Sequence, residues 1–343
     1  MAVIAQLLIS KKSSNMIVAK LPFSDCLLPS LAEISLPYKS MNYHYRSIED
    51  LNRCIVNNLG KNPPNIDLVV GMPRSGLLAA NMLSLHLNCL LTDLEGFLEG
   101  RLFETGFRLR GKAKTFSECK RVLVLEDSIF SGRSIKEIKT RIEQRYDDRD
   151  IFYAAAFVLP ESKDLVDIYY EVCPLPRLFE WNLMHHGLIT RSCVDLDGVL
   201  CRNPSESEND DAENYIHFLR SVEPCIIPTV KLGHIVTNRL EKYREHTEEW
   251  LSQHNIEYGK LIMLDLPSKQ ARIEANCYAT HKAKAYTETE SLLFIESSER
   301  QARDISRISG KSVFCTDTKQ MINPTFVRRN KGRLLQRVKK LIR

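Results

Sequence analysis

The sequence has no internal repeat and no long low-complexity segment, which excludes solenoid and propeller folds. It also contains no Cys-x-x-Cys pair, and none of its ten cysteines stands at zinc-binding spacing from a histidine. Scattered cysteines of this kind indicate reduced thiols in a reducing compartment, so we expect neither a zinc site nor a disulfide-stabilised secreted domain. A hydrophobic fraction of 43% excludes global disorder.

No apolar run is long enough to cross a membrane. The longest uncharged stretch, residues 75–92, contains Asn81, His86 and Asn88, so it is predicted to form a helix followed by a strand. The first ten residues are apolar but lack the basic residues that begin a signal peptide, and Met16 is an alternative start. We therefore expect a cytoplasmic protein.

Basic charge is concentrated in one short segment. The net charge is +5, yet residues 328–343 hold eight Lys or Arg and no acid, which leaves about −3 on the rest of the chain. A body of this charge is not a basic nucleic-acid binder, so no nucleic-acid partner is expected. The same tail carries apolar residues at helical spacing: Leu334, Leu335, Val338, Leu341 and Ile342. Such a helix is typical of peripheral contact with an anionic membrane, here the cytoplasmic face of the inner membrane, although packing on the body is an alternative.

Predicted strands and helices alternate twice along the chain, and 343 residues suffice for two domains of about 150 residues. Strands are expected at 66–71, 121–125, 151–159, 192–194, 235–236, 261–264, 292–295 and 313–314. Helices are expected at 45–59, 77–87, 135–145, 241–253 and 299–308. This alternation predicts an α/β protein with two doubly wound parallel sheets. The predicted parts are an N-terminal extension (1–39), a first domain (40–160), a connection (161–191), a second domain (192–323) and a basic amphipathic tail (324–343).

Two adjacent acids, Glu126 and Asp127, follow an apolar strand and precede a Ser/Gly-rich loop that opens a helix. Backbone N–H groups at a helix N-terminus bind phosphate, and paired carboxylates can accept hydrogen bonds from vicinal hydroxyls or stabilise positive charge on a sugar. An ordinary strand-to-helix turn capped by Ser131 or Ser134 is the simpler alternative.

This segment resembles the fingerprint of the type I phosphoribosyltransferases, which is four apolar residues, two acids and a loop ending in Ser/Thr-Gly-x-Ser/Thr. The resemblance covers about residues 40–160. It implies that Glu126 and Asp127 bind the ribose hydroxyls of phosphoribosyl pyrophosphate (PRPP), with Mg²⁺ taking part. It also implies that the loop binds the 5-phosphate, through Ser128, Ser131, Gly132, Arg133 and Ser134.

A second strand–turn–helix unit lies about fifty residues upstream, at Val69–Gly76. It resembles the family's pyrophosphate loop, with Arg74 as the cation and with Ser75 and Gly76 as backbone donors. Between the two motifs, residues 101–121 form a basic, Gly-containing segment that fits the family's mobile cover, and a solvated charged loop is the alternative. It carries Arg101, Arg108, Arg110, Lys112 and Lys114 around Gly106 and Gly111.

The second half opens with Asp195-Leu-Asp197-Gly after a short apolar strand. Two carboxylates in this spacing suit covalent phosphoryl transfer, in which one attacks phosphorus and the other protonates the leaving oxygen. The motif resembles that of the haloacid dehalogenase-like (HAD) superfamily. Apolar residues follow it, which argues against a calcium loop.

Three further motifs extend this resemblance. It implies that Thr237 hydrogen-bonds the phosphoryl group, and that Lys282, favoured over Lys284, neutralises its charge. Glu296 is implied to hold Mg²⁺ together with Asp195 and Asp197. Ser297 replaces the usual second acid of the last motif, which puts full phosphatase activity in question. No gap between the motifs fits a large cap domain, so we expect an open site suited to bulky phosphate substrates.

One half thus resembles an enzyme that attaches a 5-phosphoribosyl group, and the other resembles one that removes phosphate. Chains of this kind are similar to the phosphoribosyltransferase–phosphatase pairs that install ribofuranose in bacterial surface polysaccharides. The expected activity is transfer from PRPP to a hydroxyl of a glycan, either free or lipid-linked, followed by removal of the 5-phosphate to leave β-ribofuranose. Two alternatives remain open: a nucleobase phosphoribosyltransferase of nucleotide salvage with an attached phosphatase, and a PRPP-sensing regulator with an inactive HAD half.

Overall fold

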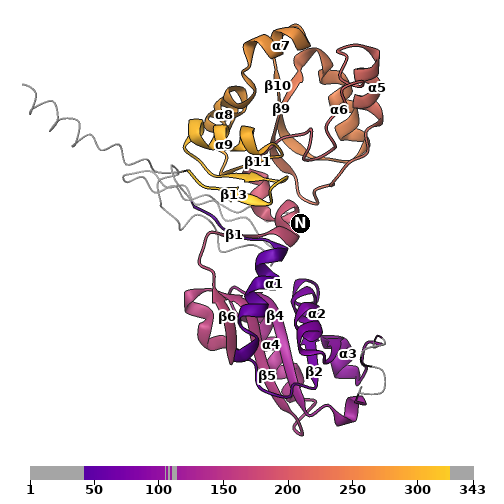
Figure 1. The fold of residues 1–343 in the computed structure, drawn as a ribbon, viewed down its shortest axis with the longest axis vertical. Coiled ribbons are helices and arrows are strands. Elements are labelled where there is room, and N and C mark those ends of the chain that lie inside the picture. Colours follow the sequence, from indigo (N-terminus) through magenta and orange to yellow (C-terminus); the bar gives the residue numbers. More distant parts are fainter. Residues whose placement is uncertain (1–41, 105, 107–108, 110–113, 325–343) are drawn as a thin grey trace, which may run out of the picture. The chain divides into compact units, whose positions relative to one another are not determined.

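The computed structural model describes residues 42–104, 106, 109 and 114–324 (Figure 1). The predicted N-terminal extension and the tail from residue 325 onward lie outside the described residues, so the predicted membrane contact stays a prediction. Arg108, Arg110 and Lys112 of the predicted pyrophosphate cover also lie outside them. Within the described ranges, no helix is both long and apolar enough to cross a membrane.

The first sheet has five parallel strands in the order β3-β2-β4-β5-β6. In chain order they are β2 (Leu68–Gly71), β3 (Leu90–Asp93), β4 (Arg121–Ile129), β5 (Asp150–Val158) and β6 (Ile168–Val172). Every residue of β2 is buried, as expected for a strand covered on both faces. The sheet extends beyond residue 160, because β6 pairs with β5 and so brings part of the predicted connection into the first sheet.

Helices cover both faces of this sheet. They are α1 (Ile48–Asn57), α2 (Ser75–Leu87), α3 (Leu94–Glu99) and α4 (Arg133–Glu143). On one face, α1 and α2 pack on alternate strand residues that include Val69 and Leu123. On the other face, α3 and α4 pack on the intervening residues, such as Val70 and Val122. This alternation follows from the two-residue period of a strand and confirms a doubly wound arrangement.

The second sheet has six strands in the order β10-β9-β8-β11-β12-β13, and all neighbours are parallel except the last pair. The strands are β8 (Ser192–Val194), β9 (Leu232–Leu240), β10 (Tyr258–Leu264), β11 (Leu293–Glu296), β12 (Val313–Cys315) and β13 (Gln320–Ile322). The helices are α5 (Glu213–Ser221), α6 (Arg244–Gln253), α7 (Lys269–Ala275), α8 (Tyr278–Glu288) and α9 (Glu299–Ser309).

Between Asp197 and Thr237 the chain forms one helix, α5, and between Thr237 and Lys282 it forms α6, β10 and α7. Neither segment contains a further sheet, so the second α/β unit carries no large cap.

Short elements complete the described chain. Strand β1 (His44–Arg46) pairs in parallel with β7 (Arg177–Phe179). The 3₁₀ turns are η2 (Leu59–Lys61), η3 (Phe116–Glu118), η4 (Pro160–Leu165), η5 (Glu180–His185), η6 (Gly187–Arg191) and η7 (Glu241–Tyr243). The chain is therefore an α/β protein with two mainly parallel sheets.

Candidate functional sites

The acidic pair lies near the carboxyl end of β4 and contacts the start of α2. Asp127 is buried, and its Oδ1 accepts a hydrogen bond from the Ser75 hydroxyl at 2.8 Å. Its Oδ2 accepts one from the indole Nε1 of Trp181 at 3.0 Å. The predicted pyrophosphate loop, which follows β2, thus contacts the acidic pair of β4. The two come together because β2 and β4 are parallel neighbours and end at the same edge of the sheet.

Glu126 lies directly over the predicted pyrophosphate loop. A Cβ placed on Gly76 would stand 3.2 Å from Glu126 Oε2 and 3.0 Å from the Leu125 carbonyl oxygen. On the opposite side, Glu126 Oε1 accepts a hydrogen bond from the Ser134 hydroxyl at 3.1 Å. Gly76 therefore permits a close approach between the loop and the carboxylate that a side chain would prevent.

The predicted 5-phosphate loop turns sharply into α4. Gly132 adopts φ +73°, in the left-handed region, and precedes the first helical residue, Arg133. Ser131, Arg133 and Ser134 are exposed, whereas Ser128 lies within β4 and is partly buried. The eleven-residue helix α4 has no side-chain N-cap, and its first N–H group, that of Arg133, donates a long hydrogen bond of 3.5 Å to the Ser131 hydroxyl. A helix N-terminus of this kind favours phosphate.

Both acids of this site are shifted toward their protonated forms. Burial, with a further contribution from Asp127, raises the pKa of Glu126 to about 7, and the Ser134 hydrogen bond opposes the shift. Burial also raises the pKa of Asp127, against the hydrogen bonds from Ser75 and Trp181. No cation contacts either carboxylate among the described residues, since Arg74 is exposed and makes no ion pair there. Two desolvated acids without a counterion favour a ligand that brings hydroxyl donors or positive charge.

Trp181 is a site residue that the sequence did not reveal. It stacks on Phe179 at a centroid distance of 4.8 Å and an interplanar angle of 14°, and Phe179 in turn stacks on Phe157 at 5.4 Å. The sequence placed Trp181 in the connection, 54 residues from Asp127. The only sequence signal for Trp181 was the pair of aromatic residues, Phe179 and Trp181, on either side of Glu180.

The second candidate site is centred on a buried lysine. Lys282 Nζ donates to Asp195 Oδ2 and to Glu296 Oε2, both at 2.6 Å, from the middle of α8. Asp195 follows β8, and Glu296 ends β11, the neighbouring strand. Lys284 is exposed and lies 3.9 Å from Glu288, so the geometry favours Lys282.

Burial raises the pKa of Asp195, and the nearby Glu296 adds to the shift while Lys282 opposes it. Burial lowers the pKa of Lys282, but Asp195 and Glu296 outweigh that effect and raise it above the ordinary value. The lysine therefore stays charged between its two carboxylates.

Thr237 lies inside β9, which runs four residues beyond the predicted strand, and is buried. It lines a cavity of about 270 Å³ together with Asp195, Asp197, Lys282, Glu296 and Ser297. These are all the residues that the HAD resemblance selected. Ser297 packs against the turn after the aspartates, because a Cβ on Gly198 (φ +83°) would stand 2.3 Å from Ser297 Oγ.

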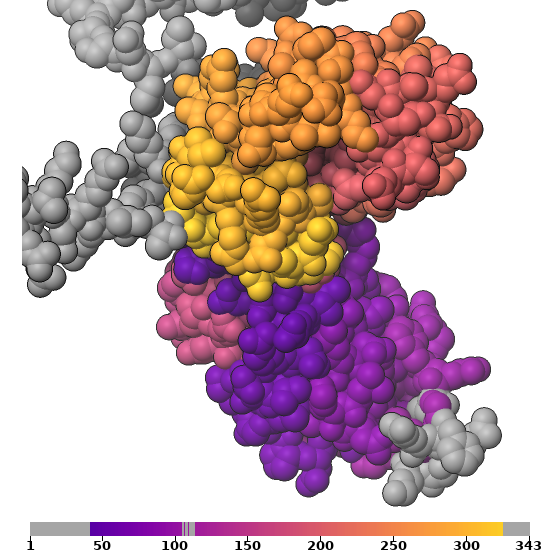
Figure 2. All heavy atoms as spheres, turned by 45° about the horizontal axis from the view of Figure 1, so that its top comes forward, coloured from indigo at the N-terminus to yellow at the C-terminus, as the bar shows by residue number. Residues whose placement is uncertain are grey.

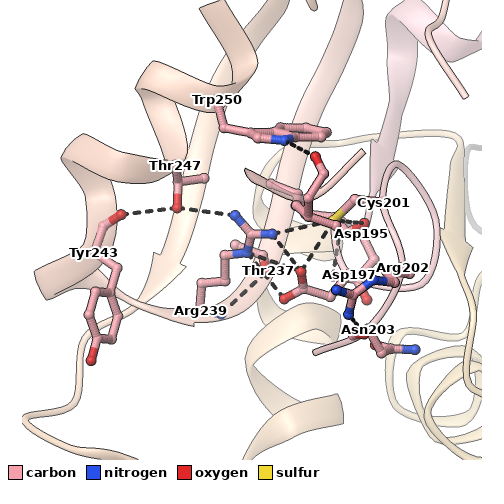
Figure 3. Close-up of polar contacts among 12 residues, drawn as sticks. Asp195, Asp197, Cys201, Arg202, Asn203, Thr237, Arg239, Tyr243, Thr247 and Trp250 are labelled. Carbon is pink, nitrogen blue, oxygen red and sulfur yellow. Dashed lines mark hydrogen bonds and ion pairs between the residues drawn. The ribbon is translucent and has the colours of Figure 1, made fainter. Parts of the chain in front are cut away.

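Asp197 is bound by an arginine that the sequence analysis did not single out (Figure 3). Arg239 Nη2 lies 2.6 Å from Asp197 Oδ1, and Arg239 Nε lies 3.1 Å from both carboxylate oxygens. The Arg239 side chain is fully buried and also contacts Thr247 Oγ1 and Cys201 Sγ. Arg239 lies two residues after Thr237 in the same strand, so the two side chains lie on the same face of the sheet. This two-residue spacing is the sequence signal that could have revealed Arg239.

The predicted Mg²⁺ ligands of this site are hard oxygen donors, which is the chemistry that Mg²⁺ prefers. As they lie, however, Asp195 and Glu296 bind Lys282, and Asp197 binds Arg239. No group of three acidic, His or Cys side chains in the described part of the chain is arranged to hold a metal. The carboxylates therefore do not fit a magnesium site in this arrangement.

Comparison with known proteins gave structural matches only. No protein-family model matches the chain, and no curated protein matches it in sequence. The xanthine-guanine-hypoxanthine phosphoribosyltransferase of Helicobacter pylori matches at 18% identity and TM-score 0.31, over 41% of this chain and 93% of that chain. The purine phosphoribosyltransferase of Pyrococcus horikoshii matches at 17% identity and TM-score 0.30, over 40% and 92%.

A hypoxanthine-guanine phosphoribosyltransferase of Bacillus anthracis matches at 14% identity and TM-score 0.24, over 37% of this chain and 79% of that chain. About 40% of the chain thus resembles phosphoribosyltransferases in structure, and the second parallel α/β unit has no identified type. At this low similarity, the chemistry of both sites depends on the side chains of this chain itself.

Proposed function

We propose that this protein transfers a 5-phosphoribosyl group from PRPP to a glycan hydroxyl and then removes the 5-phosphate, leaving β-ribofuranose. The observation that carries the first step is the meeting of Glu126 and Asp127 with the loop at Ser75 and Gly76. The observation that supports the second is the contact of Lys282 with Asp195 and Glu296.

In the first step, Glu126 and Asp127 accept hydrogen bonds from the ribose hydroxyls of PRPP. The 5-phosphate binds the N–H groups between Ser131 and Ser134, and the pyrophosphate binds beside Arg74, with Mg²⁺ arriving as part of the substrate complex. The bond from C1 to the pyrophosphate oxygen breaks, and its electron pair leaves with pyrophosphate. The acceptor oxygen bonds to C1 with inversion, which gives the β-linkage, and releases its proton to solvent.

The buried Asp127 and the partly buried Glu126 suit this step because positive charge develops on the ribose as pyrophosphate departs. Both carboxylates are desolvated, and no described cation forms an ion pair with them, so they stabilise that charge more strongly than they would in water.

In the second step, an Asp195 carboxylate oxygen attacks the phosphorus of the 5-phosphate. The bond from phosphorus to the ribose O5 breaks, and Lys282 balances the charge on the phosphoryl group. Arg239 holds Asp197 as a carboxylate, so the proton for that oxygen comes from water and reaches it by way of Asp197. Water then hydrolyses the aspartyl phosphate, which releases inorganic phosphate and restores Asp195. Arg239 holds the Asp197 carboxylate in place throughout.

The test is to incubate the protein with PRPP, Mg²⁺ and candidate glycan acceptors and to weigh the acceptor afterwards. The wild type should add a plain ribosyl group, and Asp195→Asn should accumulate acceptor that carries a phosphoribosyl group, heavier by one phosphate. Wild-type protein added without PRPP should then convert the phosphoribosylated acceptor into the ribosylated acceptor. A glycan mass that does not respond to Asp195→Asn contradicts the transfer-then-trim order.

One set of contacts favours the second candidate, a PRPP-sensing regulator with an inactive HAD half. Every predicted metal ligand is paired with Lys282 or Arg239, and Ser297 stands where an acid is usual. A sensor that transfers nothing would leave the glycan mass unchanged in both wild type and Asp195→Asn. An active transferase with an inert HAD half would give the same phosphorylated product in both. Nucleobase salvage, in contrast, predicts purine or pyrimidine acceptors, which the same incubation tests.

A further inference from the structure

A second cavity adjoins the candidate phosphatase site. It has a volume of about 460 Å³ and lies between α8 and α9, at the carboxyl-terminal end of the described chain. Figure 2 shows that this part of the chain, coloured orange to yellow, lies on the surface of the molecule. Three residues line both this cavity and the 270 Å³ cavity of Asp195: Tyr278, Ser298 and Gln301. The two cavities therefore adjoin and share a wall.

The shared wall is hydrogen-bonded to the reacting groups. The Ser298 N–H donates to Glu296 Oε1 at 3.1 Å, and Glu296 binds Lys282 through its other oxygen. The Asn238 amide donates to Gln301 Oε1 at 3.1 Å, and Asn238 directly follows Thr237. A substrate that is larger than the smaller cavity can therefore place its phosphate at Asp195 and extend across this wall into the adjoining cavity.

The adjoining cavity is lined mostly by hydrogen-bonding groups. Asn276 and Thr280 supply an amide and a hydroxyl, and Tyr278 is the only aromatic residue in the lining. Of its charged residues, Arg307 pairs with Asp304 at 2.8 Å. The remaining one, Arg300, is exposed, and its guanidinium makes no ion pair within the part of the chain that the structure describes.

We infer that this second cavity is a subsite for the acceptor portion of the phosphatase substrate, and that it binds a hydroxyl-rich, acidic oligosaccharide. The inference rests on the proposed function. Amide and hydroxyl groups match sugar hydroxyls, a single aromatic ring suits the face of one sugar, and Arg300 supplies an unbalanced positive charge for an acidic group. A nucleobase, in contrast, is commonly held by stacking on aromatic or apolar side chains, and the cavity offers one aromatic ring.

The experiment compares Arg300→Ala with Arg303→Ala. Arg303 lies on the same helix but pairs with Glu299 at 2.6 Å and does not line the cavity, so it is the matched control. Two substrates are used: p-nitrophenyl phosphate, and a 5-phosphoribosyl conjugate of an oligosaccharide that contains a uronic acid. Arg300→Ala should lower kcat/KM for the conjugate about tenfold through KM and leave p-nitrophenyl phosphate unchanged, since a charge-assisted hydrogen bond is lost. Arg303→Ala should change neither.

The outcomes separate the two proposals. If the wild type hydrolyses neither substrate, the phosphatase assignment fails, and the subsite fails with it. The wild type and Arg300→Ala can also hydrolyse both substrates with the same ratio of kcat/KM values. In that outcome the subsite proposal is wrong, and the phosphatase assignment stands. A nucleoside 5′-monophosphate is tested as a third substrate. If Arg300→Ala lowers kcat/KM for this nucleotide but not for the oligosaccharide conjugate, the cavity does not bind an acidic glycan. Thermal unfolding of each variant excludes a general loss of folded protein as the cause.

Discussion

Glu126 combines burial with a neighbouring acid, and this sets the pH range in which the first site can bind ribose. With a pKa raised to about 7, the carboxylate is largely protonated below that pH and ionised above it. An ionised carboxylate accepts hydrogen bonds from both ribose hydroxyls, whereas a protonated one donates and has lost its negative charge.

We therefore expect PRPP affinity and pyrophosphate release to rise as the pH increases from 6 to 8. Glu126→Gln should lower the activity and remove most of this pH dependence, because the amide does not titrate in that range. The measurement is pyrophosphate release against pH at fixed ionic strength. A profile of the same shape in the variant and the wild type contradicts the assignment.

Trp181 contributes both a stacked ring and a hydrogen-bond donor to Asp127. Trp181→Phe keeps the aromatic ring beside Phe179 and removes the N–H. Losing one hydrogen bond to a buried acid should cost about 1–3 kcal/mol, which corresponds to a loss of roughly 5- to 150-fold in kcat/KM for pyrophosphate release.

Trp181→Ala removes the stack as well and should lower the melting temperature, which Trp181→Phe should change little. Initial rates and thermal unfolding of the two variants separate the two contributions. Equal rates for Trp181→Phe and the wild type would show that the indole N–H has no role in the site.

Arg239 and Asp197 form a buried ion pair, so removing one partner leaves an uncompensated charge. Arg239→Met should lower the free energy of unfolding by about 3–5 kcal/mol and abolish turnover of phosphomonoesters. The double variant Arg239→Met with Asp197→Asn should lose less stability than the two single variants added together. Denaturant unfolding measures all three, and strict additivity would mean that the pair carries no coupling.

At the scale of elements, the turn after β8 depends on one glycine. Gly198 has φ +83°, and a Cβ there would stand 2.3 Å from Ser297 Oγ. Gly310, at the end of α9, has φ +69° but nothing within 4 Å of a Cβ, so it is a matched control. Gly310→Ala should cost about 1 kcal/mol from backbone conformation alone.

Gly198→Ala should lower the free energy of unfolding by more than Gly310→Ala does. It should also slow phosphomonoester hydrolysis, because Ser297 and the turn after Asp197 must move apart. Melting temperatures and hydrolysis rates of the two variants make the comparison. If Gly198→Ala and Gly310→Ala lose the same amount of melting temperature and hydrolysis rate, only the backbone angle at the glycine matters.

The sequence predicted most elements because their apolar residues follow regular periods. The strand expected at Ser192–Val194 is confirmed residue for residue, and the helix expected at 299–308 differs by one residue at its end. Strand β4 was predicted to end at Leu125, yet it continues to Ile129 because Glu126 and Ser128 still pair with β5. Local sequence does not show such pairing, since it depends on a neighbouring strand.

The elements that were not predicted have weak periodic signals or depend on distant contacts. Helix α5 lies between the predicted strands at 192–194 and 235–236, where no helix was expected, and β6 has only one buried residue. The site residues were predicted from family motifs, and the structure brings them together in two groups. Arg239 and Trp181 were missed, because their roles depend on partners 42 and 54 residues away.

At the scale of the whole molecule, the two candidate sites use separate residues in separate sheets. Glu126→Ala combined with Asp127→Ala should therefore abolish pyrophosphate release and leave hydrolysis of a supplied 5-phosphoribosyl conjugate intact. Pyrophosphate and inorganic phosphate are measured in parallel on the same preparation. Transfer that continues in this double variant would remove the donor-site assignment.

The contact between Trp181 and Asp127 also makes the first site visible by fluorescence. The chain has two tryptophans, and the second, Trp250, is fully buried with its indole N–H donated to the Val222 carbonyl at 2.7 Å. Trp250 thus provides a constant background, while Trp181 lies partly exposed beside the acid that is proposed to bind ribose. The emission of a single native residue can accordingly follow the filling of the PRPP site in real time, without a label and without turnover.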